Sequence, residues 1–246
     1  MGYLKDQEGI MNRYLREGPG WKTHLDQTRQ FIAGSFLDPS IERVAVLGSG
    51  WLLDVPLDEM TRRYKRIYLV DIHHPPQIRR KVRDIQNVEL VESDLTGGAV
   101  EQVWRISREN GIQTSCELVD KIVLHRPLEQ IQTDACISLN LLNQLDIILV
   151  DFLRKCGYFQ HEPPDIFRKM IQEYHIRWIT RAPGCLVTDT EEVNLDRNDN
   201  ESCKPLLFTP LPDGFRKGHW NWEFDSHRTY RPGTRTSMHV EAVEWK

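Results

Sequence analysis

Two apolar runs, each followed by a characteristic turn, constrain the fold of this 246-residue chain more than any other feature. The run 44–47 ends in Gly48-Ser49-Gly50, and the run 67–70 ends in Asp71. Short buried runs of this kind predict parallel strands, whose carboxyl ends meet at one edge of a sheet. Glycines let the backbone approach a ligand closely, and an acid about 20 residues further on accepts hydrogen bonds from ribose hydroxyls. The pattern predicts a nucleotide-type site at this edge, the alternative being a βαβ unit without a ligand.

The rest of the chain alternates strand-like and helix-like segments. Apolar runs predict strands at 44–47, 67–70, 88–91, 135–139, 184–189, 220–224 and 238–245. Apolar residues at helical spacing predict helices at about 54–64, 77–84, 101–110, 141–153 and 166–176, with Gly111 ending the third. The segment 119–124 fits a strand or an excursion, and the polar stretch 190–213 predicts a long loop. Five βα units followed by two close strands predict an antiparallel pair that closes the sheet.

The first 40 residues form a separate part of the pattern. Their loosely spaced apolar residues predict one or two amphipathic helices, interrupted at Gly18-Pro19-Gly20. We expect these helices mainly to cover one edge of the sheet, with a lid over the ligand as a possible second role. The sequence therefore divides into an N-terminal helical cap, 1–40, and one Rossmann-like α/β domain, 41–246.

Composition limits the classes of function. The formal net charge of −4 gives no global basic field of the kind that draws proteins to nucleic acid or anionic membranes. The most apolar segment, 137–153, is broken by acids and amides and cannot span a bilayer. Five cysteines without a C-x-x-C pair argue against a disulfide framework or a zinc ribbon, and no histidine spacing is typical of a metal site. Because the N-terminus has no apolar signal core, we expect a cytoplasmic protein.

In their order along the chain, these motifs resemble the class I S-adenosylmethionine-dependent methyltransferases over roughly 41–246. Gly48-Ser49-Gly50 matches the glycine-rich first motif of that family, and Asp71 matches the acid that holds the ribose hydroxyls. Ser93-Asp94-Leu95 matches the motif that faces the adenine amino group. Ser138-Leu139-Asn140-Leu141-Leu142 matches the exit of the fourth strand, where the methyl group lies near the substrate. The resemblance implies a doubly wound, mostly parallel seven-stranded sheet of order 3-2-1-4-5-7-6, with S-adenosylmethionine as the cofactor.

This sequence also departs from the family pattern. Val46 stands where the family often has an acid, and Leu52 stands at the third glycine position. The amino end of the cofactor then needs another partner, and Asp54 is the nearest candidate. A nicotinamide-binding domain would need a glycine in place of Leu53, and it would not explain Asp94 or the terminal strand pair. The resemblance thus implies these cofactor-binding residues: Gly48, Ser49, Gly50, Asp54, Asp71, Asp94 and Asn140.

The implied activity is transfer of a methyl group to an unidentified acceptor, and a small molecule is the expected class. Positioning supplies most of the catalysis in such a displacement, and a base is needed only if the acceptor must lose a proton. The sequence therefore assigns no catalytic residue. Side chains near the predicted edge that remain open for a ligand contact are Ser138, Asn143, Gln144, His73, His74, His161, His219 and His227.

Three other functions remain open at this point. The sequence also fits a non-catalytic adenosyl-ligand-binding protein, a methyltransferase acting on RNA or protein, and an enzyme of another group transfer, such as aminopropyl transfer. The basic clusters at 62–66 and 79–83 favour solvated helix faces over a nucleic-acid surface, because the net charge of the chain is negative. The oligomeric state has no signal in the sequence.

Overall fold

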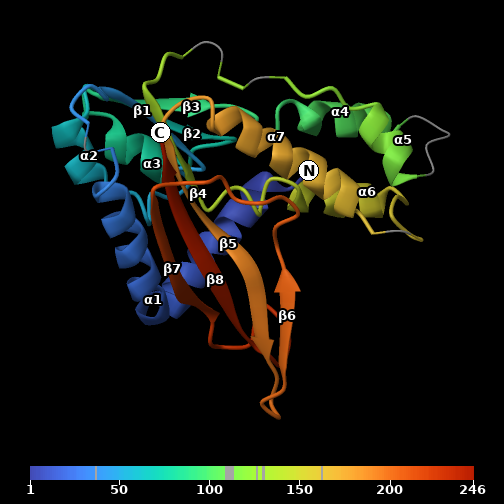
Figure 1. Cartoon of the computed structure of the whole chain (residues 1–246). Helices are drawn as coiled ribbons and strands as arrows, with labels where there is room; N and C mark the ends of the chain where they lie inside the picture. Colours follow the sequence, from blue (N-terminus) through green and yellow to red (C-terminus); the bar gives the residue numbers. More distant parts are fainter. Residues whose placement is uncertain (37, 109–113, 126, 129–130, 162) are drawn as a thin grey trace.

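The computed structural model describes residues 1–36, 38–108, 114–125, 127–128, 131–161 and 163–246, and within them eight strands form one sheet. The strands are β1 Arg43–Leu47, β2 Arg66–Asp71, β3 Val88–Glu92, β4 Ala135–Leu139, β5 Gly184–Leu195, β6 Glu201–Pro205, β7 Arg216–Asp225 and β8 Arg235–Trp245. Their order is β3-β2-β1-β4-β5-β8-β7, and β6 pairs with β5 (Figure 1). Strands β1 to β5 pair in parallel, whereas β6, β7 and β8 pair antiparallel. The predicted methyltransferase-like order is confirmed, with β8-β7 as its terminal antiparallel pair.

Strand β1 lies in the middle of the sheet and is covered on both faces. Val44 and Val46 belong to one hydrophobic core, whereas Ala45 and Leu47 belong to a second core on the opposite face. Each of the four is at most 2% exposed. A strand covered on both faces reads as a continuous apolar run instead of an alternating one, which explains why this segment was recognisable in the sequence.

Seven helices of the described chain cover these two faces. They are α1 Tyr3–Ala33, α2 Leu57–Arg63, α3 Pro76–Val82, α4 Ala99–Ile106, α5 Ser115–Asp120, α6 Ile147–Lys155 and α7 Asp165–Ile179. Buried side chains of α1, α2 and α3 join the first core, and those of α4 to α7 join the second. Figure 1 shows α1 lying beside β7, which is its main partner in the sheet. None of these helices is both long and apolar enough to cross a membrane.

The N-terminal segment forms one helix of 31 residues, so the predicted interruption at 18–20 is wrong. Pro19 lies inside α1 and cannot donate a hydrogen bond to the carbonyl of Leu15. Leu15 is 72% exposed, so water can donate a hydrogen bond to its carbonyl. On the other face of the helix, Trp21 and Ile32 are each 2% exposed and pack in the first core. Burial of this face outweighs the local preference for a break.

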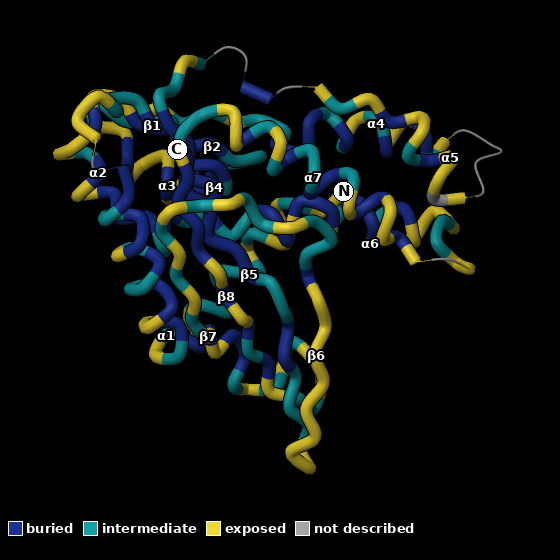
Figure 2. Tube along the Cα trace, viewed as in Figure 1, coloured by how far each residue is buried: buried dark blue, intermediate teal, exposed yellow. Residues whose placement is uncertain are grey.

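The predicted loop over 190–213 is wrong for residues 190–205, which form the end of β5, a turn and β6. Strand β5 continues to Leu195, and the chain turns back to form β6. The Asp196 carboxylate stabilises the turn by accepting hydrogen bonds from the backbone N–H groups of Asn198 and Asn200, at 2.7 and 2.9 Å. All five residues of β6 are exposed, as Figure 2 shows, so its polar composition reflects solvent contact on both faces. The sheet therefore has eight strands instead of the predicted seven.

Three smaller predictions are also changed. Helix α4 ends at Ile106, and the predicted helix end at 110–111 lies outside the described residues. The ambiguous segment 119–124 is no strand, because its first residues close the short helix α5, which Thr114 caps by accepting a hydrogen bond from a backbone N–H. Helix α6 begins at Ile147 instead of 141, because residues 141–146 form turns at the exit of β4.

Candidate functional site

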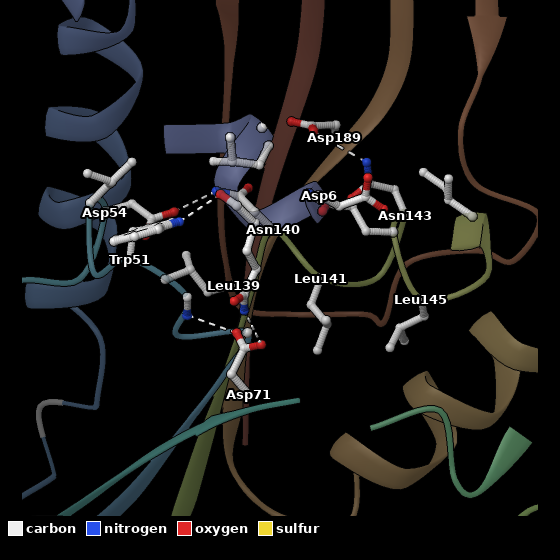
Figure 3. A pocket seen from close by; sticks show the side chains of 18 of the residues that line it. Asp6, Trp51, Asp54, Asp71, Leu139, Asn140, Leu141, Asn143, Leu145 and Asp189 are labelled. Carbon is white, nitrogen blue, oxygen red and sulfur yellow. Dashed lines mark hydrogen bonds between the residues drawn. The ribbon is translucent and has the colours of Figure 1, made fainter. Parts of the chain in front are cut away.

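A cavity of about 460 Å³ lies over the carboxyl ends of β1, β2 and β4, where the sequence predicted a site. Its volume is in the range of small-molecule pockets. The predicted residues Gly48, Ser49, Gly50, Asp54, Asp71, Asp94 and Asn140 all line it. Figure 3 shows Asp54, Asp71, Asn140 and Asp189 around this central cavity.

The glycine turn between β1 and α2 is held directly against β2. The backbone N–H groups of Gly48 and Ser49 both donate to the carbonyl of Val70, at 2.9 and 3.1 Å. Gly48 has φ +80°, and a Cβ there would lie 2.7 Å from the carbonyl oxygen of Leu139. Gly50 has φ +42°, with no neighbour closer than 3.8 Å to an added Cβ. Gly48 is therefore required by the close approach of β4, whereas Gly50 leaves open space at the cavity.

Asp71 ends β2 with its carboxylate turned toward the glycine turn. Oδ2 accepts a hydrogen bond from the backbone N–H of Gly50 at 2.8 Å, and Oδ1 accepts one from Ile72 at 2.8 Å. Burial raises the pKa of Asp71, although these N–H groups and the nearby His74 oppose the rise. A backbone hydrogen bond from His73 also lowers this pKa.

The first turns of α1 close the cavity on the side of Asp71. Gln7 Nε2 donates to Asp71 Oδ1 at 2.9 Å and to the carbonyl of His73 at 2.9 Å. The indole Nε1 of Trp51 in turn donates to the carbonyl of Gln7 at 2.8 Å. Tyr3 also lines the cavity, and burial together with the charge of Asp94 raises its pKa. Helix α1 therefore serves as edge cover and as a wall of the cavity.

Asp54 and Asn140 form a second polar pair, on the loops that follow β1 and β4. Asn140 has φ +46° and donates from Nδ2 to Asp54 Oδ2 at 2.7 Å. Because a carboxylate only accepts hydrogen bonds, the amide must point its NH₂ group toward Asp54. Asn140 Oδ1 is then left buried without a partner among the described residues. Desolvation raises the pKa of Asp54 to about 6, against the lowering effects of its hydrogen bonds and of Arg29.

Asp94 follows β3 and has a local role in addition to its place at the cavity. Its Oδ1 accepts hydrogen bonds from the backbone N–H of Thr96 at 2.8 Å and from the Thr96 hydroxyl at 2.5 Å. Its Oδ2 lies 3.4 Å from the backbone N–H of Val100. The carboxylate thus shapes the turn that leads into α4 and still faces the cavity.

Asp189 on β5 is the main cavity residue that the sequence analysis did not single out. It is 3% exposed, and its Oδ2 accepts a hydrogen bond from Asn143 Nδ2 at 3.3 Å. Its Oδ1 is buried without a partner in the described chain. Desolvation, with a further contribution from the charge of Asp54, raises the pKa of Asp189 to about 7, and the bond from Asn143 opposes the rise. Asp189 ends the apolar run from which the sequence predicted a strand at 184–189, and it follows the last pairing of β5 with β4 at Val187, which was the signal that could have identified it.

Three aromatic side chains, Trp21, Trp222 and Phe224, form an aromatic wall of the cavity between α1 and β7. Trp222 makes edge contacts with Trp21 and Phe224, with ring centroids 4.7 and 4.9 Å apart. The indole of Trp21 donates to the carbonyl of Phe224 at 3.0 Å. Arg13, also on α1, lies over the outer aromatic rings, 4.5 Å from the centroid of Phe224 and 4.9 Å from that of Tyr230. The wall gives this part of the cavity an apolar lining.

Several of the open candidates lie elsewhere. Ser138 is fully buried and shares a hydrogen bond of 2.8 Å with His175 Nε2, on the side of α7. His74 is buried with its ring nitrogen 3.2 Å from the carbonyl of Val91, and His73 pairs with Glu92. Neither these residues nor His161, His219 and His227 line the central cavity, whereas Asn143 and Gln144 do.

Comparisons with known proteins give similarities of fold alone. No family model and no curated protein matches the chain. Among solved structures, it is similar to a DhpI–SAM–HEP complex, with a TM-score of 0.41, 10% identity, and coverage of 98% of this chain and 95% of that chain. It is also similar to a bacterial CtHen1 methyltransferase domain, with a TM-score of 0.35, 14% identity, and coverage of 88% of this chain and 99% of that chain. For a DhpI–SAH complex the TM-score is 0.34 and the identity 13%, with coverage of 94% of this chain and 86% of that chain. At these TM-scores, the class I methyltransferase-like fold rests on the strand order of the chain itself.

Proposed function

We propose that this protein transfers a methyl group from S-adenosylmethionine to a small-molecule acceptor bound in the central cavity. The observation that carries the proposal is the arrangement at Asp71, a partly buried carboxylate at the end of β2 that accepts a hydrogen bond from the N–H of Gly50 at 2.8 Å. This pairing places two features at one edge of a sheet of methyltransferase-like order. They are a carboxylate able to accept hydrogen bonds from ribose hydroxyls and an open glycine turn.

The charges of the cavity support a cationic cofactor. Asp54 has a raised pKa, which reflects desolvation without full compensation by a positive charge. The sulfonium and ammonium groups of S-adenosylmethionine are positive and would lower the cost of ionising such a carboxyl group. The unpartnered Oδ1 of Asn140 offers a further acceptor. The residues present therefore fit the cofactor that the sequence motifs imply.

Each predicted residue then has a physical task. Asp71 accepts hydrogen bonds from the ribose hydroxyls, Asp94 faces the adenine end, and Asp54 with Asn140 holds the amino end. Gly48-Ser49-Gly50 keeps the turn clear of side chains between these groups. When bound, S-adenosylmethionine supplies a methyl group activated by positive sulfur. The chain contributes by orienting the acceptor and excluding water, which lowers the barrier of an in-line displacement.

A small acceptor is favoured over RNA by the distribution of charge. Arg13 is the arginine that lines the cavity, and its guanidinium already lies over aromatic rings. In the basic cluster around α3, Arg79 pairs with Glu92. At the start of β2, Lys65 pairs with Glu42. A polyanion would gain little from such a surface.

Titration calorimetry tests the cofactor. S-adenosylmethionine and S-adenosylhomocysteine should bind to the protein, whereas NAD should not. Asp71→Ala removes charge-assisted hydrogen bonds of about 1.5–3 kcal/mol, so the affinity for both adenosyl compounds should fall about ten- to a hundredfold. Circular dichroism should show an intact fold.

Glu92→Ala is the matched control. Glu92 pairs in register with Asp71 at the same sheet edge but does not line the cavity. Its removal should leave the affinity for S-adenosylhomocysteine within about twofold. Equal losses in the two variants, or binding of NAD in place of the adenosyl compounds, would contradict the proposal.

A further inference from the structure

Asp189 lines the cavity from β5, the strand next to β4. The backbone N–H of Asn140 donates to the carbonyl of Val187 at 2.8 Å, which aligns the exit of β4 with β5. Asp189 follows two residues later on β5 and, like Asn140, faces the central cavity (Figure 3). The two side chains therefore approach one space from neighbouring strands.

The Asp189 carboxyl group is held in place by two neighbours. Thr188 Oγ1 donates to Asn143 Oδ1 at 3.3 Å, which orients the amide so that its Nδ2 donates to Asp189 Oδ2 at 3.3 Å. All three residues are at most 4% exposed. This support leaves Oδ1 of Asp189 without a partner in the described part of the chain. An oriented, buried and unsatisfied carboxyl oxygen is costly for the fold, and such groups concentrate at functional sites.

The unpartnered Oδ1 of Asp189 can accept a hydrogen bond, and the charges around it favour a positively charged donor. Asp54 adds negative charge nearby, and Glu192 on the same strand is already paired with Arg231 at 2.9 Å. Arg13 from α1 lies against Phe224 and Tyr230. Asn140 Oδ1 is a second acceptor without a donor in the same cavity. A hydroxyl group has a single O–H to offer, whereas an amine nitrogen carries two or three N–H donors and a positive charge when protonated.

The aromatic wall defined by Trp21, Trp222 and Phe224 limits the rest of the acceptor. These rings line the same cavity and offer apolar surface to a ligand that is anchored at Asp189. Aromatic faces also attract a cation through their quadrupole. A compact amine with an apolar or aromatic body satisfies both the carboxyl group and the wall.

We propose that the cavity binds an amine as methyl acceptor, with its nitrogen at the Asp189 carboxyl group and its apolar body against the aromatic wall. The inference rests on the proposed methyl transfer. Asp189 takes a proton from the ammonium form, which leaves a lone pair on nitrogen. The nitrogen uses this lone pair to form the bond to the methyl carbon, and the carbon–sulfur bond breaks with its electron pair going to sulfur. The methylated amine leaves as its ammonium cation, and Asp189 releases the proton that it took to solvent.

Three matched probes test the inference: benzylamine, benzyl alcohol and benzoate. Their binding is measured by calorimetry at pH 8, with and without saturating S-adenosylhomocysteine, which cannot donate a methyl group. Benzylamine should bind at least tenfold more tightly than benzyl alcohol, and benzoate should bind most weakly. Asp189→Asn should lower the affinity for benzylamine at least tenfold and leave that for benzyl alcohol within about twofold. The affinity of Asp189→Asn for S-adenosylhomocysteine should change less than threefold.

Glu191→Gln is the matched control on the same strand, because Glu191 pairs with His239 and does not line the cavity. It should bind all three probes like the unmodified protein. Equal affinity for the amine and the alcohol, no binding of the amine, or full amine affinity in Asp189→Asn would overturn the inference. Absence of S-adenosylhomocysteine binding would instead contradict the proposed function. The affinities for the three probes measured without S-adenosylhomocysteine would still test whether Asp189 binds the amine.

Discussion

At the scale of single residues, the cavity contains carboxyl groups that a fold selected for stability alone would not keep. Asp189 and Asp54 are desolvated, and their pKa values rise to about 7 and about 6. Their side-chain hydrogen bonds come from neutral amides: Asn143 donates to Asp189, and Asn140 donates to Asp54. A buried negative charge without a cationic partner destabilises the unliganded protein, and the same charge stabilises a complex with a cationic ligand.

Replacement of Asp189 by asparagine should therefore stabilise the protein, and only at higher pH. The ordinary pKa of 3.8 applies to the unfolded chain and about 7 to the folded protein. Between these values the folded state binds the additional proton, so stability falls as pH rises through this window. The gain from Asp189→Asn should be near zero at pH 4 and should reach up to about 4 kcal/mol above pH 7. Urea denaturation at pH 4.5 and pH 8 measures the difference.

The control for this effect is again Glu191→Gln, which removes a carboxylate from the same strand outside the cavity. Its effect on the free energy of unfolding should be small at both pH values. The other charged groups that line this part of the cavity are Asp54, Glu192 and Arg13, and all three are unchanged in the variant. A gain from Asp189→Asn of the same size at both pH values would contradict the raised pKa.

At the scale of elements, α1 forms most of the N-terminal cap and also contacts the site. Its first turns bring Gln7 onto Asp71, and its later turns bring Trp21 onto β7. Asp71 Oδ1 already accepts bonds from Ile72 and Gln7, so its lone pairs are in use. A ribose with two hydroxyl groups at Asp71 must replace the contact from Gln7.

The variant Gln7→Ala should therefore bind S-adenosylhomocysteine more tightly. Loss of one competing hydrogen bond of about 0.5–1.5 kcal/mol corresponds to an affinity gain of about two- to tenfold. Glu8→Ala, an exposed neighbour on α1, should have no effect. Calorimetry on both variants measures the change. Weaker binding by Gln7→Ala would mean that Gln7 itself contacts the cofactor.

At the scale of the whole molecule, the packing of α1 favours one cooperative unit. The division into 1–40 and 41–246 would allow the cap to melt separately from the sheet. Yet Trp21 is 2% exposed, contacts Trp222, and donates to the carbonyl of Phe224. These contacts join the first core to the antiparallel end of the sheet.

The variant Trp21→Ala should accordingly lower the free energy of unfolding of the entire protein by about 3–5 kcal/mol, in a single transition. Trp104→Ala is the matched control, since Trp104 is 45% exposed and should contribute about 1 kcal/mol or less. Urea denaturation followed by circular dichroism gives both values. Two separate transitions in Trp21→Ala would support an independent cap.

The sequence by itself determined the parallel half of the sheet and the residues at its carboxyl edge. Buried parallel strands appear as uninterrupted apolar runs, and the turns after them carry Gly48, Gly50 and Asp71, because these positions follow directly in the chain. Both signals are local. The same local reasoning missed the exposed hairpin of β5 and β6, whose polar residues resemble a loop, and it broke α1 at Pro19.

The tertiary structure alone decided which distant side chains meet at the cavity. Asn143 and Asp189 are 46 positions apart, and Gln7 and Asp71 are 64 apart. Their pairing depends on the register of β4 with β5 and on the docking of α1 against β7. No local spacing encodes these long-range contacts, because they follow from the burial of whole faces. For this reason the sequence predicted where the cofactor motifs lie, whereas the structure brought Asp189 and the aromatic wall to the same cavity.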